Sequence, residues 1–214
     1  MLDTAQIIIN ENKQIKLTPN YFFHTHNGKP EQKYKTDITI IQLNDGLKFN
    51  FHCHNDSYIE DNTYTENNTA MWNQEVFEIF IASGSNSPIQ YFEIEVNPNG
   101  AIYTDLITNA DLTGKNNSHL FLDAKANGIK HKITKDIYGH SYFGEIFLPF
   151  KLIGKSKEYR INFYRVVSKQ NHTNKNWACT PSTCLFLAFN PTMSGSSPQF
   201  HLSKKMSLLS LQDN

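Results

Sequence analysis

Alternation of apolar and polar side chains with a period of two is the feature that most constrains how this chain can fold. Residues 91–96 (YFEIEV) and 47–53 (LKFNFHC) each carry an apolar side chain at every second position. Successive side chains of a β-strand point to opposite faces, so this pattern predicts strands with one buried face. Segments whose apolar residues recur with helical periodicity are scarce. Only residues 149–154 (PFKLIG) are expected to form a short helical turn closed by glycine.

Turn residues separate these segments and indicate how they pair. Residues 37–41 and 47–53 are predicted to form a hairpin, because the intervening Asp45-Gly46 suits a tight turn. About ten short strands with polar connections predict an all-β fold, namely an antiparallel β-sandwich with little helix and a single domain over residues 1–214. The other expected strands are 76–81, 91–96, 101–103, 120–122, 129–133, 142–148, 159–167 and 206–211, with polar loops at 55–70, 104–119 and 168–199.

The charge balance argues against two classes of partner. The chain has 20 basic and 20 acidic side chains among 214 residues. It therefore lacks an overall field that would attract nucleic acid or an anionic membrane. The first residues, MLDTAQIIINENKQ, show no basic stretch followed by a long apolar run. As the sequence stands we expect a cytoplasmic protein, or an extracellular or periplasmic one if a leader has been removed.

Three cysteines are too few for a disulfide framework. Cys179 and Cys184 could close a small loop in an oxidising compartment and leave Cys53 free. In a chain without a recognisable leader, we expect instead that all three are reduced and behave as small apolar side chains.

Glu78 lies in the middle of the apolar strand 76–81 (VFEIFI). If this strand pairs with residues 91–96 so that their apolar faces coincide, Glu78 shares the other face with Glu93 and Glu95. Directly opposed residues have Cβ atoms about 4.5–5.5 Å apart, so these like charges need water, a cation, hydrogen-bond donors or a ligand. Three interpretations are open: a solvated face, a polar ligand site, or the carboxyl pair of a retaining glycosidase, in which the two groups are about 5–5.5 Å apart.

The two tryptophans, Trp72 and Trp177, both have polar neighbours in the sequence. They are therefore predicted to be exposed platforms rather than core residues. An indole face can pack against the C–H surface of a sugar ring while nearby amides and carboxylates bind the hydroxyls. The alternative is that each indole covers the edge of the core.

Five segments are informative through their order and spacing: 72–80 (WNQEVFEIF), 91–100 (YFEIEVNPNG), 144–150 (GEIFLPF), 160–165 (RINFYR) continuing to Trp177, and 198–201 (PQFH). Together they resemble family 9 carbohydrate-binding modules, in particular the stand-alone family 9-like domains of bacterial proteins. The resemblance covers about residues 35–211, and residues 184–197 look like an insertion within it.

This resemblance implies a DOMON-like β-sandwich of jelly-roll type that binds a mono- or oligosaccharide without catalysis. In the family two tryptophans clamp a sugar, and Trp72 and Trp177 stand at those positions. The family's hydrogen-bonding glutamate and asparagine correspond to Glu78 and Asn174. The family also binds structural calcium, for which Asp56 is a weak candidate, and no other cofactor is expected.

His172 and His201 are further candidates for ligand contacts, because they lie near Trp177 or within a matching segment. The pairs His24/His26 and His52/His54 could form a transition-metal site, although structural or surface histidines are the expected case.

Two other functions remain open beside non-catalytic binding. One is glycoside hydrolysis in carbohydrate catabolism, with Glu78 acting together with Glu93 or Glu95. The other is a degenerate scaffold, in which the two indoles are too far apart or too deeply packed to admit a sugar ring. The sequence contains no G-x-S-x-G, H-E-x-x-H or phosphate-binding glycine loop.

Overall fold

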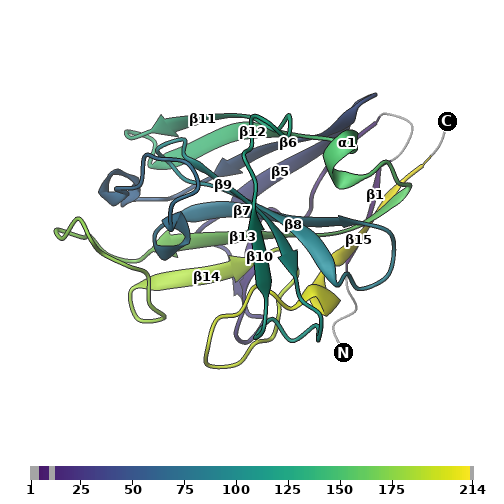
Figure 1. The fold of residues 1–214 in the computed structure, drawn as a ribbon. Helices are drawn as coiled ribbons and strands as arrows, with labels where there is room; N and C mark the ends of the chain where they lie inside the picture. Colours follow the sequence, from purple (N-terminus) through teal and green to yellow (C-terminus); the bar gives the residue numbers. More distant parts are fainter. Residues whose placement is uncertain (1–4, 10–12, 213–214) are drawn as a thin grey trace.

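Two β-sheets stacked face to face make up the fold, and both are visible in the ribbon view of this computed structural model (Figure 1). The structure describes residues 5–9 and 13–212. The larger sheet contains, in spatial order, β10 (Ser118–Phe121), β9 (Ile102–Thr108), β8 (Gln90–Val96), β7 (Val76–Ser83), β13 (Glu158–Ser168), β14 (Cys184–Ala188), β3 (Phe22–His24) and β4 (Pro30–Glu31), with β15 (Ser207–Leu211) on β13 and β1 (Gln6–Ile9) on β15. The five-stranded sheet contains β11 (Lys130–Asp136), β12 (Ser141–Pro149), β6 (Gly46–Cys53), β5 (Thr36–Gln42) and β2 (Gln14–Lys16).

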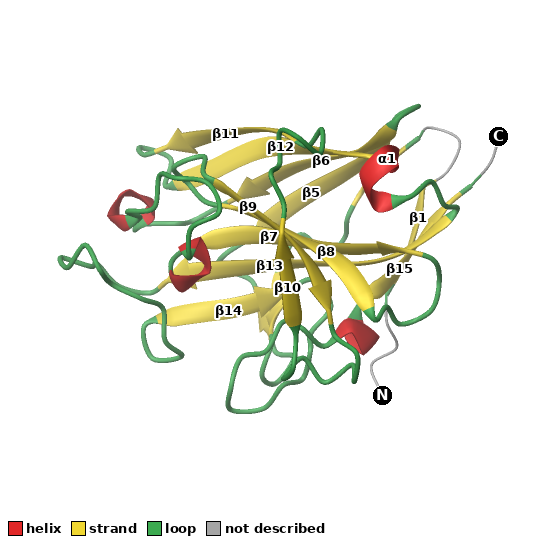
Figure 2. Ribbon diagram, viewed as in Figure 1, coloured by secondary structure: helices red, strands yellow, loops and turns green. Residues whose placement is uncertain are grey.

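The strands in the described ranges pair antiparallel, apart from the parallel pair of β1 with β15. The predicted antiparallel β-sandwich is therefore confirmed. Helix is scarce, as Figure 2 shows. The described helical segments are the single turn α1 (Phe150–Ile153), which ends at Gly154 with φ 77°, and the 3₁₀ turns η1 (Ile59–Asp61), η2 (Met71–Asn73) and η3 (Ser203–Lys205). None of the helices in the described ranges has the length and apolarity that a membrane-spanning helix needs.

The core between the sheets is rich in aromatic side chains from the alternating strands. Phe51 of β6 stacks on Phe77 of β7 with ring centroids 4.2 Å apart. Phe49, two residues earlier on β6, meets Phe163 of β13 edge to face at 6.0 Å. All four rings are at most 4 % exposed. The period-two pattern thus produces one buried face on each sheet, and the large rings hold the sheets together.

The structure corrects two expectations for the region that was predicted as a polar loop, residues 168–199. Residues 184–188 form β14, which pairs with β13 over five residues and buries Leu187 and Ala188. This strand shows no period-two alternation and is flanked by polar turns, so the sequence pattern does not distinguish it from an insertion.

The second correction concerns the cysteines. Cys179 and Cys184 form a disulfide, so the expectation of three reduced cysteines is wrong for this pair. The backbone N–H groups of Thr183 and Cys184 both donate to the carbonyl of Thr180, and this tight turn brings the two thiols together. Cys53 is free and buried, as expected.

Candidate functional site

The strands β7 and β8 pair in the register that the apolar pattern predicts. Glu78 lies directly opposite Glu95, and Glu93 lies opposite Phe80. Glu93 is therefore the diagonal neighbour of Glu78 on the same face. Because the alternate residues of both strands face the core, the three carboxyls lie together on the outer face of the ten-stranded sheet.

The apolar neighbours of Glu78 on this outer face are themselves covered. Val76 belongs to a buried cluster with Trp177, and Phe80 belongs to a second one against which Phe200 packs. The sequence predicts a groove or a second packed layer here, because it places valine and phenylalanine on the same face as Glu78. Between these two clusters the carboxyls face a cleft rather than bulk solvent.

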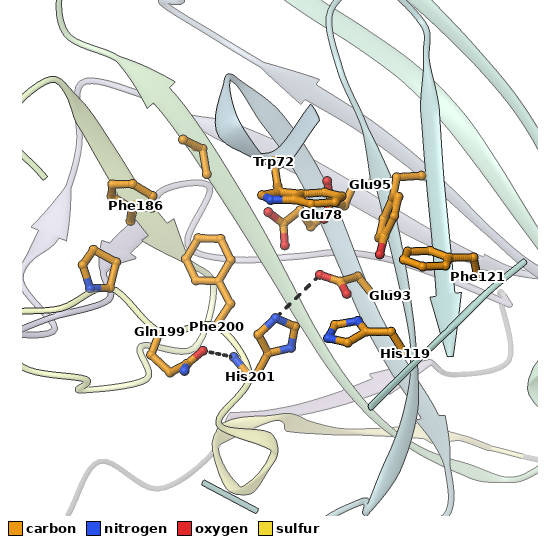
Figure 3. A pocket seen from close by; sticks show the side chains of 13 residues that line it. Trp72, Glu78, Glu93, Glu95, His119, Phe121, Phe186, Gln199, Phe200 and His201 are labelled. Carbon is orange, nitrogen blue, oxygen red and sulfur yellow. Dashed lines mark hydrogen bonds and ion pairs between the residues drawn. The ribbon is translucent and has the colours of Figure 1, made fainter. Parts of the chain in front are cut away.

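The cleft has a volume of about 500 Å³, and its carboxyls lie beneath an aromatic wall (Figure 3). Trp72 and Phe121 are 42 % and 61 % exposed, whereas Glu78, Glu93 and Glu95 are at most 5 % exposed. A ligand that enters therefore meets ring faces first and the carboxyls at the base. The lining residues are Trp72, Glu78, Glu93, Glu95, Tyr103, His119, Phe121, Val166, Phe186, Pro198, Gln199, Phe200 and His201.

Trp72 is held in the wall by the turn η2, which directly precedes β7. Met71 is fully buried and anchors this turn, so the next side chain points outward. The Gln74 side chain fixes the other end of the turn, since its Oε1 accepts from the Thr63 backbone N–H at 2.8 Å. The indole packs edge to face on Tyr103 at 4.8 Å. Trp72 therefore projects from a rigid support.

The strands β9 and β10 extend the polar row of the cleft. Tyr103 lies opposite Glu95, and Asp105 lies opposite Glu93. The Tyr103 hydroxyl donates to Asp105 Oδ2 at 2.9 Å, and His119 Nδ1 lies 2.7 Å from the same oxygen. The fully buried Asp105 thereby fixes the orientation of a phenol and an imidazole at the edge of the cleft.

Residues 198–201 close the opposite side without forming regular structure. Phe200 stacks on Tyr164 with centroids 4.4 Å apart, and the Tyr164 hydroxyl donates to the Phe200 carbonyl at 2.9 Å. The side-chain amide of Asn109 donates to the His201 carbonyl at 2.7 Å. His201 Nδ1 lies 2.8 Å from the Tyr91 hydroxyl. These contacts give an irregular segment a defined conformation.

Burial dominates the electrostatics of the carboxyls. It raises the pKa of Glu93 to about 8, with Asp105 adding to the increase and a hydrogen bond from Glu95 opposing it. The pKa values of Glu78 and Glu95 are also raised well above the usual range, first by burial and then by the neighbouring carboxylates. In the described part of the chain, no lysine or arginine lines the cleft to offset this effect. Near neutral pH the group therefore holds protons and can both donate and accept hydrogen bonds.

His201 stays neutral in this surrounding. Burial, followed by the charge of His119, lowers its pKa to about 4. Its Nε2 lies 3.9 Å from Glu93 Oε1, and at this distance a neutral imidazole forms a polar contact rather than an ion pair. The predicted candidate His201 thus lines the cleft as a neutral group.

Trp177 is not an exposed platform, and this expectation is wrong. Its side chain is 6 % exposed and does not line the cleft. His172 stacks flat on the indole at 3.8 Å, and Nε1 donates to the Asp61 carbonyl at 2.7 Å. Trp177 lies behind the cleft wall, in the cluster that contains Tyr103, so the two-tryptophan clamp is not formed here.

Two further predicted residues also lie outside the cleft. His172 Nε2 forms a hydrogen bond with the Ser168 hydroxyl, and the two atoms lie 2.7 Å apart. Asn174 is exposed, and its Oδ1 accepts from the Asn176 backbone N–H at 2.9 Å. Both side chains therefore order the loop that carries Trp177.

Asp56, the calcium candidate, is fully buried beside a cation that the protein itself supplies. Arg165 Nη2 lies 3.2 Å from Asp56 Oδ2, and neither side chain is exposed. Glu75 lies close enough to hydrogen-bond to Asp56, and burial followed by that negative charge raises its pKa. A divalent ion at Asp56 would be placed next to the guanidinium, so these residues do not fit a calcium site.

Sequence reasoning missed several residues that line the cleft or support its lining. His119 and Phe121 lie at or beside the expected strand 120–122, but a short exposed strand gives no sign of what it faces. Asp105 lies in the predicted loop 104–119, but β9 continues five residues beyond the expected end of this strand and includes it.

Among the described residues, the three glutamates are the one group of three or more acidic, histidine or cysteine side chains close enough to share a metal ion. The four histidines of the two His-x-His pairs do not form such a group there.

No protein-family model matches this chain. A curated relative, described as an extracellular protein of Arthroderma benhamiae, is 26 % identical over 151 residues, which cover 66 % of this chain and 68 % of that protein.

Solved structures match this chain over more of its length than the curated relative does. A proposed carbohydrate-binding protein from Bacteroides uniformis superposes with a TM-score of 0.66 and 14 % identity over 94 % of this chain and 88 % of that chain. A family 9 carbohydrate-binding module from Caldicellulosiruptor kristjanssonii in complex with glucose gives 0.55 and 10 % identity over 98 % and 97 %. Its complex with cellotriose gives 0.51 and 11 % over 98 % and 95 %. The chain therefore has the β-sandwich fold of the family 9 carbohydrate-binding modules.

Proposed function

We propose that the protein binds a saccharide in this cleft without catalysis. The observation that carries the proposal is the position of Trp72, an exposed indole on a rigid turn above three buried carboxyls. Sugars present an apolar C–H face and a rim of hydroxyls, and an aromatic wall above a polar base matches both. Glucose and cellotriose in complexes of modules with the same fold support this ligand class.

Each part of the cleft has a role in this proposal. Trp72 stacks on one ring face, and Phe121 and Phe200 limit the slot on either side in place of Trp177 (Figure 3). The enclosed Oε2 atoms of Glu78 and Glu95 have no partner among the described residues. Sugar hydroxyls would satisfy these two oxygens and remove the free-energy cost of leaving them unpaired.

The disulfide supports a location outside the reducing cytosol. The extracellular description of the curated relative points the same way. We therefore propose an extracellular or periplasmic protein in place of the cytoplasmic one.

Glycoside hydrolysis is less well supported by the same residues. A retaining mechanism needs one protonated carboxyl and one ionised carboxylate. The pKa of Glu93, about 8, suits the acid, but burial also raises the pKa values of Glu78 and Glu95, which disfavours the ionised carboxylate that the second role requires. If the protein hydrolyses aryl-glycosides and Glu78→Gln abolishes this activity, glycoside hydrolysis would be supported over non-catalytic binding.

Titration with glucose, xylose and cello- or xylo-oligosaccharides, followed by amide NMR shifts and tryptophan fluorescence, tests the proposal. Binding should be lost in Trp72→Ala, because the stacking platform disappears. It should persist in Trp177→Phe, because that ring lies outside the cleft. No response at millimolar saccharide would favour a degenerate scaffold, and equal loss in both variants would instead support the two-tryptophan clamp.

A further inference from the structure

The carboxyls at the base of the cleft are close enough to share a ligand. One oxygen from each of Glu78, Glu93 and Glu95 lies within 4.8 Å of the other two. Cross-strand pairing fixes this separation, since Glu78 and Glu95 are directly opposed and Glu93 is diagonal. The described lining of the cleft contains no lysine or arginine that could neutralise them.

Unpartnered oxygens on buried side chains point independently to a ligand. Glu78 is 2 % exposed and lines the cleft, yet its enclosed Oε2 has no hydrogen-bond partner in the described chain. Asp105, fully buried on β9, also has an enclosed oxygen without a partner, Oδ1. A buried polar oxygen that finds no donor costs free energy. Because the cleft is open, a group from solution can reach Glu78.

We propose that Glu78, Glu93 and Glu95 form a binding site for a hard divalent cation of the size of Ca²⁺. Carboxylate oxygens are the ligands that such cations prefer. With Ca–O distances of about 2.3–2.6 Å, oxygens on opposite sides of the ion lie about 4.6–5.2 Å apart, which accommodates oxygens that all lie within 4.8 Å of one another. Mg²⁺, with bonds of about 2.0–2.1 Å, spans about 4.0–4.2 Å and therefore needs the oxygens to lie closer together than Ca²⁺ does.

The cleft leaves part of the coordination sphere open. Ca²⁺ takes about 6–8 oxygen ligands, and three carboxylates that each supply one oxygen fill at most half of these positions. Binding of the ion displaces the protons that the three carboxyls hold near neutral pH. Water completes the coordination sphere in the protein without saccharide. In a final step that rests on the proposed function, two adjacent hydroxyls of a saccharide stacked on Trp72 replace that water, so the cation strengthens saccharide binding.

Calcium titration of the chelator-treated full chain, without saccharide, tests the site by calorimetry. Tb³⁺ luminescence excited through Trp72 gives a second signal. We expect one ion per chain, with affinity weakened at least about tenfold in Glu78→Gln and in Glu95→Gln. Glu145→Gln, which neutralises a half-exposed carboxyl on the other sheet, should bind like the wild type. Absence of binding, or unchanged affinity in both cleft variants, would overturn the site.

A measurement on the wild-type protein covers the case that a variant does not fold. Mn²⁺ should broaden the amide NMR signals of β7 and β8 around Glu78, Glu93 and Glu95, and broadening centred elsewhere would contradict the proposal. Saccharide titrations with Ca²⁺ and with chelator then separate the two ideas. Ca²⁺ binding without any saccharide binding overturns the proposed function and supports the cation site. If the saccharide affinity is equal with and without Ca²⁺, the inference that the cation strengthens saccharide binding is wrong.

Discussion

Two groups of buried carboxyls in this protein meet their need for partners in opposite ways. In the first, Asp56 Oδ2 lies 3.2 Å from Arg165 Nη2, although Asp56 Oδ1 has no hydrogen-bond partner among the described residues. The two oxygens of Glu75 accept from the Ser168 backbone N–H at 2.7 Å and from the Asn62 side-chain amide at 2.5 Å. In the second, which comprises Glu78, Glu93 and Glu95, the described lining offers no lysine or arginine, and two enclosed oxygens have no partner.

The difference shows which buried acids serve the fold and which serve a ligand. Burial raises the pKa of Glu75 as it raises that of Glu78, so burial alone does not identify a site. A site is indicated instead by a buried carboxyl oxygen that has no partner within the protein and that belongs to a side chain lining a cleft open to solvent. Three predictions test this distinction, from the largest expected effect to the smallest.

Removing the internal cation should be the most damaging change. Arg165→Met leaves Asp56 as an uncompensated buried charge, so the free energy of unfolding should fall by about 3–5 kcal/mol. Urea denaturation measures the loss. Arg160→Met is the matched control on the same strand, because Arg160 binds only backbone carbonyls in the described structure and should cost less. Equal losses would show that the Asp56 pair has no special role.

The cleft carboxyls should make the protein less stable as the pH rises. The pKa of Glu93 is about 8 when folded, against an ordinary value of 4.5. Between these values the folded state holds a proton that the unfolded state has lost, so stability falls from about pH 4.5 to about pH 8. Urea midpoints in chelator at several pH values should show this slope, and Glu93→Gln should flatten it. A rise in stability over this range, with the same slope in the variant, would contradict the interpretation.

The same substitution should have opposite signs in the two groups. At pH 8 in chelator, Glu95→Gln removes a carboxyl whose ionised form is disfavoured by burial and by the neighbouring carboxylates, and it should stabilise the protein by about 1 kcal/mol. Glu75→Gln should destabilise, because one of its two accepting oxygens becomes an NH₂ group facing a donor. Thermal unfolding compares the variants. A loss of stability in both would remove the contrast between the groups.

The sequence allowed prediction of the fold and of the carboxyl group, because both depend on local alternation. A shift of one residue would have turned the apolar side chains of β7 and β8 away from the core, so their pairing register was determined. Glu78, Glu93 and Glu95 therefore had to share a face, and the structure places them there.

Tertiary contacts decide the remainder. The polar neighbours of Trp72 and Trp177 looked alike, yet η2 turns one indole outward while His172 and the Asp61 carbonyl enclose the other. His119 enters the site only because β10 pairs with an extended β9. No sequence spacing gives these positions, since each depends on where a distant segment ends.

The contrast between the two indoles also equips the protein with two separate spectroscopic reporters. Trp72 is exposed to solvent at the entrance of the cleft, so its emission spectrum should respond when a bound ligand displaces water. Trp177 emits from a dry interior and responds when the chain loses its packing. A single emission scan can therefore distinguish occupancy from denaturation without any added dye.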